Sequence, residues 1–257
     1  GSFCAAMNDL TKKIYQNNLI SFAEHFVDDA KQKRSFTRSF PEIRNSKFSY
    51  KPGKSKKIIE SSGIRIRAIA DLSSSGNINA MADRLRSKFN GDFDLIDISS
   101  ISIKSGCIGC CRCGYENICT YDNADDFRAT FEKMIINADV IFFLGTIKDR
   151  YLSSTFKKFF DRSFFKNHAP AYRDKQIGWI ISGPLGQIPN LRQIFEAYSD
   201  VFSGNLAGIA TVESANSARI DSQIDSLAEN AIIFARDKYT SPQTFLGVGG
   251  IKIFRDE

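Results

Sequence analysis

The chain changes hydrophobic period repeatedly, and these changes divide it into short strands and longer helices. Five short apolar runs predict β-strands at 64–70, 93–98, 140–144, 177–181 and 207–212. Segments with apolar residues three or four positions apart predict helices at about 77–89, 122–138, 153–165, 190–201 and 215–239. Strands that alternate with helices in this way predict an α/β fold with a doubly wound, five-stranded parallel sheet.

The first 60 residues follow another pattern. Apolar residues at helical spacing predict an amphipathic helix that ends near Lys33, namely Leu10, Ile14, Leu19, Phe22, Phe26 and Ala30. Residues 34–60 are polar and basic and contain Pro41, Pro52 and Gly53, which predicts an extended arm or linker. We therefore expect an N-terminal helix and basic arm (1–60), a domain (61–240) and an irregular tail (241–257).

The net charge of +6 is confined to this N-terminal part. Residues 1–60 contain 12 Lys or Arg and 6 Asp or Glu, and the rest of the chain is neutral. A solvated face, or a surface for an acidic partner, explains this better than nucleic-acid binding, which ranks last among the functions considered.

Composition also bears on location. No apolar run approaches the ~18 residues of a membrane helix, and the N-terminus lacks the basic-then-apolar pattern of a signal peptide. We therefore expect a cytoplasmic protein without a membrane partner. Clustered cysteines in such a reducing compartment indicate metal or redox chemistry more than structural disulfides.

Five of the six cysteines lie between Cys107 and Cys119. Leaving Cys111 aside, they follow the pattern C-x2-C-x2-C-x5-C, with ligand candidates Cys107, Cys110, Cys113 and Cys119. Four converging thiolates are what a [4Fe–4S] cluster needs. A zinc site usually pairs two C-x2-C motifs across a longer gap. A thiol-rich loop without metal, or with a redox disulfide, is the third interpretation.

A second candidate site follows from the sheet. Five strands fit the flavodoxin-like order, in which ligands bind at the carboxyl ends of the strands, here loops 71–77, 145–152 and 182–189. Loop 71–77 has three serines ahead of a helix, which suits a phosphate because backbone amides and the helix dipole favour an anion there. An ordinary serine helix cap explains the same residues.

Residues 64–212 resemble the flavodoxin-like NAD(P)H-dependent FMN reductase superfamily, and particularly its iron–sulfur flavoprotein branch. Three features carry the resemblance. The first is the serine loop ending in Gly76-Asn77, and the second is the cysteine loop followed by Asp125-Asp126. The third is Ala138-Asp139 before the apolar strand, with Gly145-Thr146 after it and Lys157 to Asp161-Arg162 closing the next helix.

The resemblance implies where the cofactors bind. The FMN phosphate would be held by Ser73, Ser74, Ser75 and Asn77. Gly145, Thr146 and the residues after them, Lys148 and Arg150 included, would line the isoalloxazine. The third loop would contribute Ser182, Gly183 and Gly186. The four cysteines named above would ligate the cluster.

Two regions depart from the family pattern. Asp71 and Ile78 stand where the family usually has Ser and Thr, and a carboxylate that faces a phosphate is unfavourable unless it points away. The second loop reads Gly-Thr-Ile-Lys-Asp-Arg instead of Gly-Thr-Pro-x-Tyr. Its Lys148 and Arg150 either stabilise a reduced, anionic flavin or are surface charges.

These observations lead to two functional hypotheses. The first is a flavin-dependent oxidoreductase or electron-transfer protein that resembles NAD(P)H-dependent FMN reductases, with FMN and a candidate [4Fe–4S] cluster. Its redox partner would be NAD(P)H or an electron carrier, and the family implies a homo-oligomer. The alternative is a degenerate flavodoxin-like module without flavin that serves as an interaction or scaffold domain.

Overall fold

A computed structural model describes residues 9–37, 40–55, 57–166, 169, 171–201 and 203–249 of the 257-residue chain. The first eight residues of the predicted N-terminal segment and residues 250–257 of the predicted tail fall outside these residues.

The centre of the fold is a five-stranded sheet in which every neighbouring pair of strands is parallel. The strands lie in the order β2-β1-β3-β4-β5. Their bounds are Ile66–Ala70 (β1), Phe93–Asp97 (β2), Val140–Thr146 (β3), Gln176–Ser182 (β4) and Asn205–Thr211 (β5). This is the flavodoxin-like order that the sequence predicts, with β1 and β3 at the switch point.

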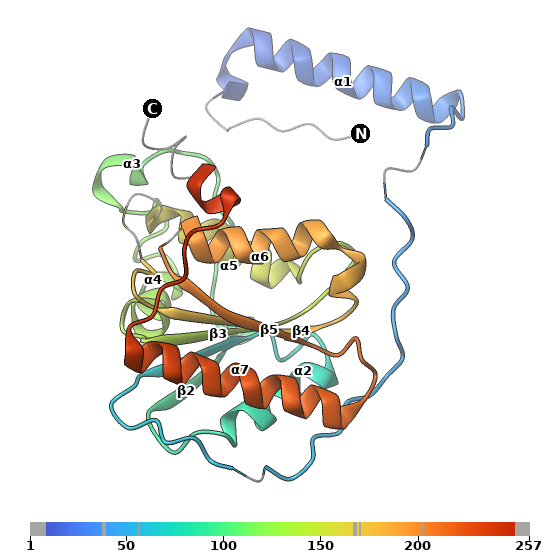
Figure 1. Ribbon diagram of the computed structural model, residues 1–257. Coiled ribbons are helices and arrows are strands. Elements are labelled where there is room, and N and C mark those ends of the chain that lie inside the picture. The colour runs from blue at the N-terminus through green and yellow to red at the C-terminus, as the bar shows by residue number, and fades with distance from the viewer. Residues whose placement is uncertain are drawn as a thin grey trace.

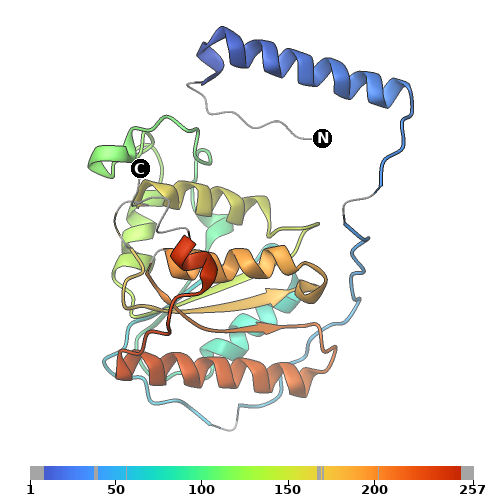
Figure 2. The ribbon, with the colours of Figure 1, turned by 45° about the horizontal axis from the view of Figure 1, so that its top comes forward.

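Helices cover both faces of the sheet (Figures 1 and 2). One layer consists of α2 (Gly76–Arg86) and α7 (Ser217–Asp237), and the other of α4 (Phe127–Phe131), α5 (Ser154–Ser163) and α6 (Pro189–Val201). Because both faces are covered, all seven residues of β4 are buried. This explains why the central strands are continuously apolar.

Each helical layer has its own hydrophobic core against the sheet. Aromatic side chains are concentrated in the core under α4, α5 and α6. There the Trp179 indole stacks on the rings of Phe143 and Phe195, with centroid distances of 4.7 and 4.1 Å. Aliphatic side chains dominate the core under α2 and α7. The two cores fix the strand ends and therefore the loops at the carboxyl edge.

The structure corrects two predictions of secondary structure. The helix expected at 122–138 begins only at Phe127 and continues as a π-helical turn, Glu132–Ile136. Residues 119–126 instead form turns, since the Asp122 and Ala124 amides donate to the carbonyls of Cys119 and Tyr121. Residues 245–249 of the expected irregular tail form a short helix.

Three further short helices among the described residues have no predicted counterpart. They are Cys113–Glu116 (α3) in the cysteine loop and the 3₁₀ turns Ile98–Ser100 (η2) and Leu185–Gln187 (η5), whereas the 3₁₀ turn Phe164–Lys166 (η4) continues the helix predicted at 153–165. Each is shorter than the window over which hydrophobic periodicity can be recognised.

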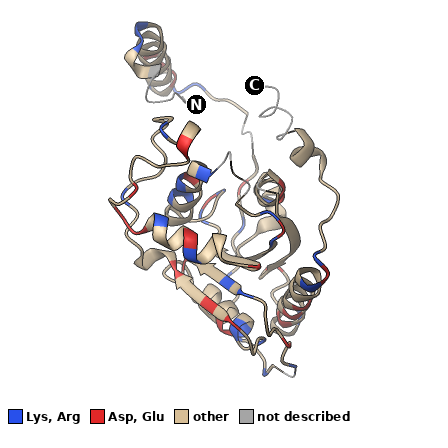
Figure 3. Ribbon diagram, turned by 90° about the vertical axis from the view of Figure 1, so that its left-hand side faces the viewer, with Lys and Arg blue, Asp and Glu red and all other residues tan. Residues whose placement is uncertain are grey.

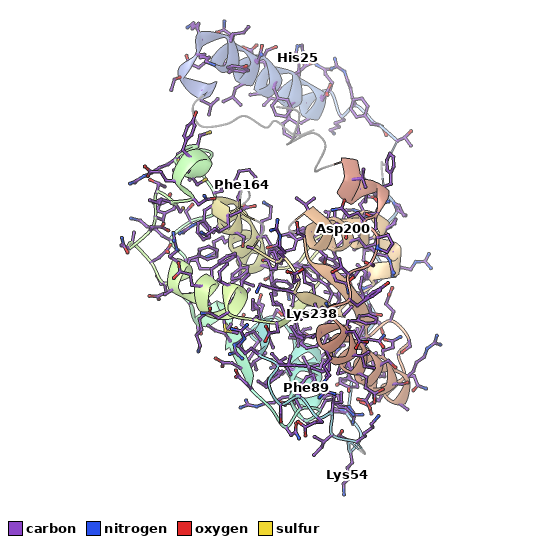
Figure 4. All side chains as sticks on the ribbon, turned by 60° about the vertical axis from the view of Figure 1, so that its left-hand side comes forward. His25, Lys54, Phe89, Phe164, Asp200 and Lys238 are labelled. Carbon is purple, nitrogen blue, oxygen red and sulfur yellow. The ribbon has the colours of Figure 1, made fainter. Side chains whose placement is uncertain are left out.

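The N-terminal segment leaves the domain (Figure 1). A 3₁₀ turn (Asp9–Thr11, η1) precedes α1 (Lys13–Lys31), which has no buried residue. An extended arm then returns along the domain, so that His25 on α1 and Lys54 on the arm lie at opposite ends of the molecule (Figure 4).

Two further observations concern the surface. Lys and Arg are interspersed with Asp and Glu on the helices of the domain (Figure 3), which does not favour a nucleic-acid site there. In the described ranges, no helix combines the length and apolarity needed to cross a membrane.

Candidate functional site

The loop between β1 and α2 presents a capped helix N-terminus at the carboxyl edge of the sheet. The Ser75 hydroxyl accepts a hydrogen bond from the backbone N–H of Asn77 and so caps α2. The Ser74 hydroxyl donates to the Asp71 carbonyl (2.6 Å) and lies 2.9 Å from the Thr146 hydroxyl on β3. This contact joins the first two predicted ligand loops.

Asp71 does not face this helix N-terminus. Its side chain is 1% exposed, and its two carboxylate oxygens accept hydrogen bonds from the hydroxyls of Ser73 (2.8 Å) and Ser153. The Ser153 hydroxyl also caps α5 by accepting from the Phe156 amide. Asp71 therefore holds the β1–α2 loop to the start of α5. Its carboxylate points away from the helix N-terminus, as a phosphate bound there would require.

A pocket of about 550 Å³ lies beside Ser74 and Ser75. Loops after β1, β3, β4 and β5 form its walls, together with part of the N-terminal arm. Seven predicted cofactor residues line it, namely Ser74, Ser75, Asn77, Thr146, Lys148, Ser182 and Gly183. The volume falls in the range of small-molecule and cofactor sites, and the position is the one where doubly wound sheets bind ligands.

Gly183 is required where two of these walls meet. It has a φ of 133°, and a Cβ added there would lie 2.8 Å from Cβ of Ile147. The backbones after β3 and β4 can approach closely because this side chain is missing.

The other four predicted cofactor residues do not line the pocket. The Ser73 hydroxyl is directed to Asp71. Gly145 packs under Leu152 and Phe156, and the Gly186 amide donates to Glu213 (2.7 Å). The Arg150 guanidinium turns to the arm, where it donates to the Pro41 carbonyl and lies 4.7 Å from the centroid of the Phe40 ring.

Sequence reasoning missed several residues of the pocket. The arm contributes Arg44, Asn45, Ser46 and Phe48, and the loops after β4 and β5 add Gln187 and Glu213. The arm lies outside the family resemblance, and no motif marks these residues. Only the contacts of the fold place them at the site.

Charged side chains of opposite sign lie at different ends of the pocket. The Lys148 ammonium donates to the Ser74 carbonyl (3.0 Å) and so brings a positive charge to the β1–α2 loop. Glu213 engages the Gly186 amide and the Thr211 hydroxyl at the β4 and β5 loops. An anionic group is therefore favoured at the α2 end of the pocket.

The cysteine loop forms a second, much smaller pocket of about 70 Å³. Its walls include all four predicted ligands, Cys107, Cys110, Cys113 and Cys119, and also Cys111. All five are free thiols. Among the residues that the structure describes, no group of three or more His, Cys, Asp or Glu converges as a metal site.

A buried ion pair supports the wall of this second pocket. The side chains of Arg162 and Asp125 are fully buried and their nearest charged atoms lie 2.6 Å apart. The Arg162 guanidinium carbon also lies 4.8 and 4.9 Å from the ring centroids of Tyr121 and Phe127. Burial raises the pKa of the Cys113 thiol, and the neighbouring Cys107, Cys119 and Cys110 add to this shift. The pocket thus favours the neutral form of that thiol.

The two candidate sites lie at opposite ends of α5. Ser153 at its start contacts Asp71 in the first loop, whereas Asp161 and Arg162 near its end line the cysteine pocket. A helix of 10 residues is about 15 Å long. Phenylalanine side chains of α5 fill the space between, since the Phe156 and Phe159 rings lie 5.5 and 5.8 Å from the Phe160 ring.

Comparison with solved structures agrees with this architecture. RosB in complex with 8-demethyl-8-formylriboflavin-5'-phosphate matches with a TM-score of 0.50 and 12% identity, over 76% of this chain and 88% of RosB. The chain has a flavodoxin-like fold. A WrbA-like flavodoxin from Agrobacterium tumefaciens matches with a TM-score of 0.45 and 17% identity, over 69% of this chain and 100% of that one.

An azoreductase from Bacillus anthracis matches with a TM-score of 0.47 and 10% identity, over 68% of this chain and 99% of that one. No protein-family model matches the sequence, and no curated protein matches it. At these identities the structural matches establish the fold alone.

Proposed function

We propose that the protein is a flavin-dependent oxidoreductase that binds FMN in the pocket of about 550 Å³ at the carboxyl edge of the sheet. The observation that carries the proposal is the capped N-terminus of α2, which opens into this pocket with Ser74, Ser75 and Lys148 around it. The riboflavin phosphate bound to RosB, which shares the fold, supports the same ligand class.

The chain's own residues fit a phosphate ester at this end. Gly76 is the first residue of α2, and a Cβ added to it would meet nothing within 4 Å, so an anion can approach the helix start closely. Ser74, Ser75 and Thr146 supply hydroxyls, and Lys148 supplies the positive charge. The Asp71 carboxylate, which departs from the family pattern, is bound by Ser73 and Ser153 and does not line the pocket.

The remaining walls would orient the ring system. Ile147 and Gly183 bring an apolar side chain and a bare backbone to the β3 and β4 loops, and Ser182 adds a hydroxyl. A bound flavin accepts a hydride or single electrons, and the protein supplies its position and electrostatics. The reductant would be NAD(P)H or an electron carrier.

Turnover with a reductant tests this proposal. The chain, incubated with FMN and freed of excess flavin, should oxidise NADH or NADPH, or accept electrons from dithionite, with bleaching of the bound flavin bands. Bound flavin that neither nucleotide reduces would leave an electron-transfer role. A chain that retains no flavin would refute the proposal.

The cysteine loop enters the proposal as a candidate [4Fe–4S] site. The shared pocket of Cys107, Cys110, Cys113 and Cys119 and their spacing support it. The described residues contain no converged metal-binding group. We therefore assign no electron-transfer step to this loop.

A second candidate function is a degenerate module that acts in protein interaction. Two of the predicted phosphate ligands favour this function, because their polar groups already have partners within the chain. The Ser73 hydroxyl donates to Asp71, and the side-chain oxygen and NH₂ of Asn77 bond the backbone of the arm. A chain that stays colourless after incubation with FMN would support this candidate.

We also propose a homo-oligomer. Helix α1 exposes a set of large apolar side chains, which is typical of interaction surfaces, namely Ile14, Leu19, Ile20, Phe26 and Val27. Light scattering of the intact chain and of a chain that begins at residue 40 would test this, since loss of α1 should reduce the mass per particle to that of one chain.

A further inference from the structure

The N-terminal arm crosses the carboxyl edge of the sheet beside the candidate flavin pocket. Ile43 packs against the core under α5 and α6, whereas Phe48 packs against the core under α2 and α7. The segment between them therefore passes from one helical layer to the other. Its residues Arg44, Asn45 and Ser46, with Phe48, form one wall of the pocket.

Two side-chain amides hold this segment, one from each of two ligand loops. The side-chain oxygen of Gln187 accepts a hydrogen bond from the backbone N–H of Arg44 (2.8 Å), and its side-chain NH₂ donates to the Arg44 carbonyl (3.0 Å). The side-chain oxygen of Asn77 accepts from the backbone N–H of Tyr50 (2.8 Å), and its NH₂ donates to the Phe48 carbonyl (3.0 Å). Each amide faces one backbone donor and one backbone acceptor, so a single orientation satisfies both of its ends.

The arm is fixed more firmly just beyond this segment. Tyr50 is 3% exposed, and its hydroxyl contacts the Asp221 carboxylate, which also accepts from the Gly53 amide (2.9 Å). Arg84, itself buried, donates to the Gly53 carbonyl (2.8 Å) and forms an ion pair with Asp225 (2.6 Å). Residues 50–53 are thus anchored on α2 and α7, whereas residues 44–48 are held by Gln187, Asn77 and the packing of Phe48.

We infer that residues 44–48 form a strap, anchored at Tyr50, that closes the flavin pocket from within the same chain, with Asn77 and Gln187 as positioning residues that hold the strap. The inference rests on the proposed function and concerns access to that site. Flavin entry and release then require residues 44–48 to detach from Gln187 while the anchor at residues 50–53 stays in place. Asn77, expected from the family to hold the phosphate, has this second role in the chain.

Flavin dissociation and strap cleavage test the inference together. The release rate of FMN is measured by fluorescence recovery for the wild type, Gln187→Ala and Asn77→Ala. Loss of the two hydrogen bonds that each side chain makes to the strap and its anchor should raise this rate about tenfold in each variant. Gln187→Glu keeps the acceptor for the Arg44 amide and removes the donor to its carbonyl, so its rate should lie between those of the wild type and Gln187→Ala.

Asn90→Ala is the matched control. The Asn90 amide also holds the arm, through Ser61 and Glu60, but at a point remote from the pocket. This variant should release FMN within about twofold of the wild-type rate, because the strap contacts are intact.

Limited trypsin digestion distinguishes two causes of faster FMN release, namely detachment of the strap and loss of a direct contact between Gln187 and the flavin. Cleavage after Arg44 and Lys47 should be faster in flavin-free Gln187→Ala than in the flavin-free wild type, and saturating FMN should slow it about tenfold in the wild type. A direct contact between Gln187 and the flavin would not change cleavage of the flavin-free chain.

The outcomes distinguish the two proposals. FMN binding with unchanged release rates in both alanine variants, and without protection of residues 44–47, would overturn the strap and leave the flavin function standing. Absence of FMN binding in the wild type would refute the flavin function and the strap with it.

Discussion

The carboxylate of Asp71 accepts a hydrogen bond from the hydroxyl of Ser153, the residue that caps α5. This buried contact turns a charge that would oppose a phosphate away from the pocket. Asp71 stands where the family that this chain resembles usually has a serine, and its carboxylate holds the β1–α2 loop to the start of α5. The departure from the family pattern is therefore compatible with an anionic ligand.

The first prediction concerns this contact. Asp71→Ser should leave the affinity for FMN within about threefold of the wild type, because the carboxylate does not line the pocket. It should also lower the free energy of unfolding by about 1–3 kcal/mol, since the hydroxyls of Ser73 and Ser153 lose a buried acceptor. Flavin titration and urea unfolding measure the two effects. A gain in FMN affinity of tenfold or more would show that the carboxylate acts on the phosphate.

The second prediction concerns the start of α2. FMN should bind about tenfold more tightly than riboflavin, because a helix N-terminus favours the phosphate charge. Ser75→Ala removes the cap and should reduce this preference and cost about 1 kcal/mol of stability.

Ser73→Ala is the control for this experiment, since the Ser73 hydroxyl is directed to Asp71 and not to the pocket. Its preference for FMN over riboflavin should match that of the wild type. Equal affinities of the wild type for the two flavins would contradict a phosphate site at α2.

The third prediction is a pH dependence of stability. Burial alone would raise the pKa of Asp125, but hydrogen bonds from Arg162 and from the Lys104 and Phe127 amides outweigh it and hold this pKa below its usual 3.8. A depressed folded-state pKa stabilises the fold at pH values above 3.8, and this contribution is lost as the pH falls through the lowered value. Asp125→Asn should therefore flatten the decline in stability on acidification.

Removal of this carboxylate at neutral pH should be costly. Asp125→Ala leaves the buried Arg162 guanidinium without its partner and should lower the free energy of unfolding by about 3–5 kcal/mol. Asp126→Ala, at the neighbouring exposed carboxylate, should have a much smaller effect. Chemical denaturation at several pH values measures both variants, and equal losses for the two would refute a special role of the buried pair.

The fourth prediction concerns the cysteine loop. If a [4Fe–4S] cluster forms, anaerobic reconstitution should give roughly four irons per chain. Serine variants of Cys107, Cys110, Cys113 and Cys119 should each lose most of this iron. Cys111→Ser should retain it, because Cys111 lies in the same pocket but outside the ligand pattern. Full iron loading in all four ligand variants, or none in the wild type, would remove the cluster from the account.

The sequence was sufficient to predict the sheet and its order. The apolar runs that became β3 and β4 lie between two helical layers, and their burial on both faces is what removes polar residues from them. Ile78 illustrates the same logic, since it is fully buried in the core under α2 and its departure from the family's threonine does not alter the pocket.

The candidate site was only partly predictable. Ser74 and Ser75 lie in the loop after β1 and Thr146 ends β3, so topology alone brings them to the pocket. Arg150 and Gly186 also follow strands, but contacts with Pro41 and Glu213 direct them away. Such contacts join segments distant in sequence and have no local signature.

The arm shows the same limit most clearly. Composition predicts an extended basic segment, and nothing in its pattern indicates that Arg44 and Phe48 line a pocket formed by loops far along the chain. The Gln187 side chain hydrogen-bonds only the backbone N–H and C=O of Arg44, so this contact does not depend on which residue stands at position 44.

Titration of the flavin-free chain with FMN, followed by calorimetry under anaerobic conditions, tests the central claim most directly. Saturable binding of about one FMN per chain, tighter than that of riboflavin, is expected in the pocket at the start of α2. Absence of heat and of fluorescence quenching at FMN concentrations up to about 1 mM, which corresponds to a binding free energy weaker than about −4 kcal/mol, would contradict it.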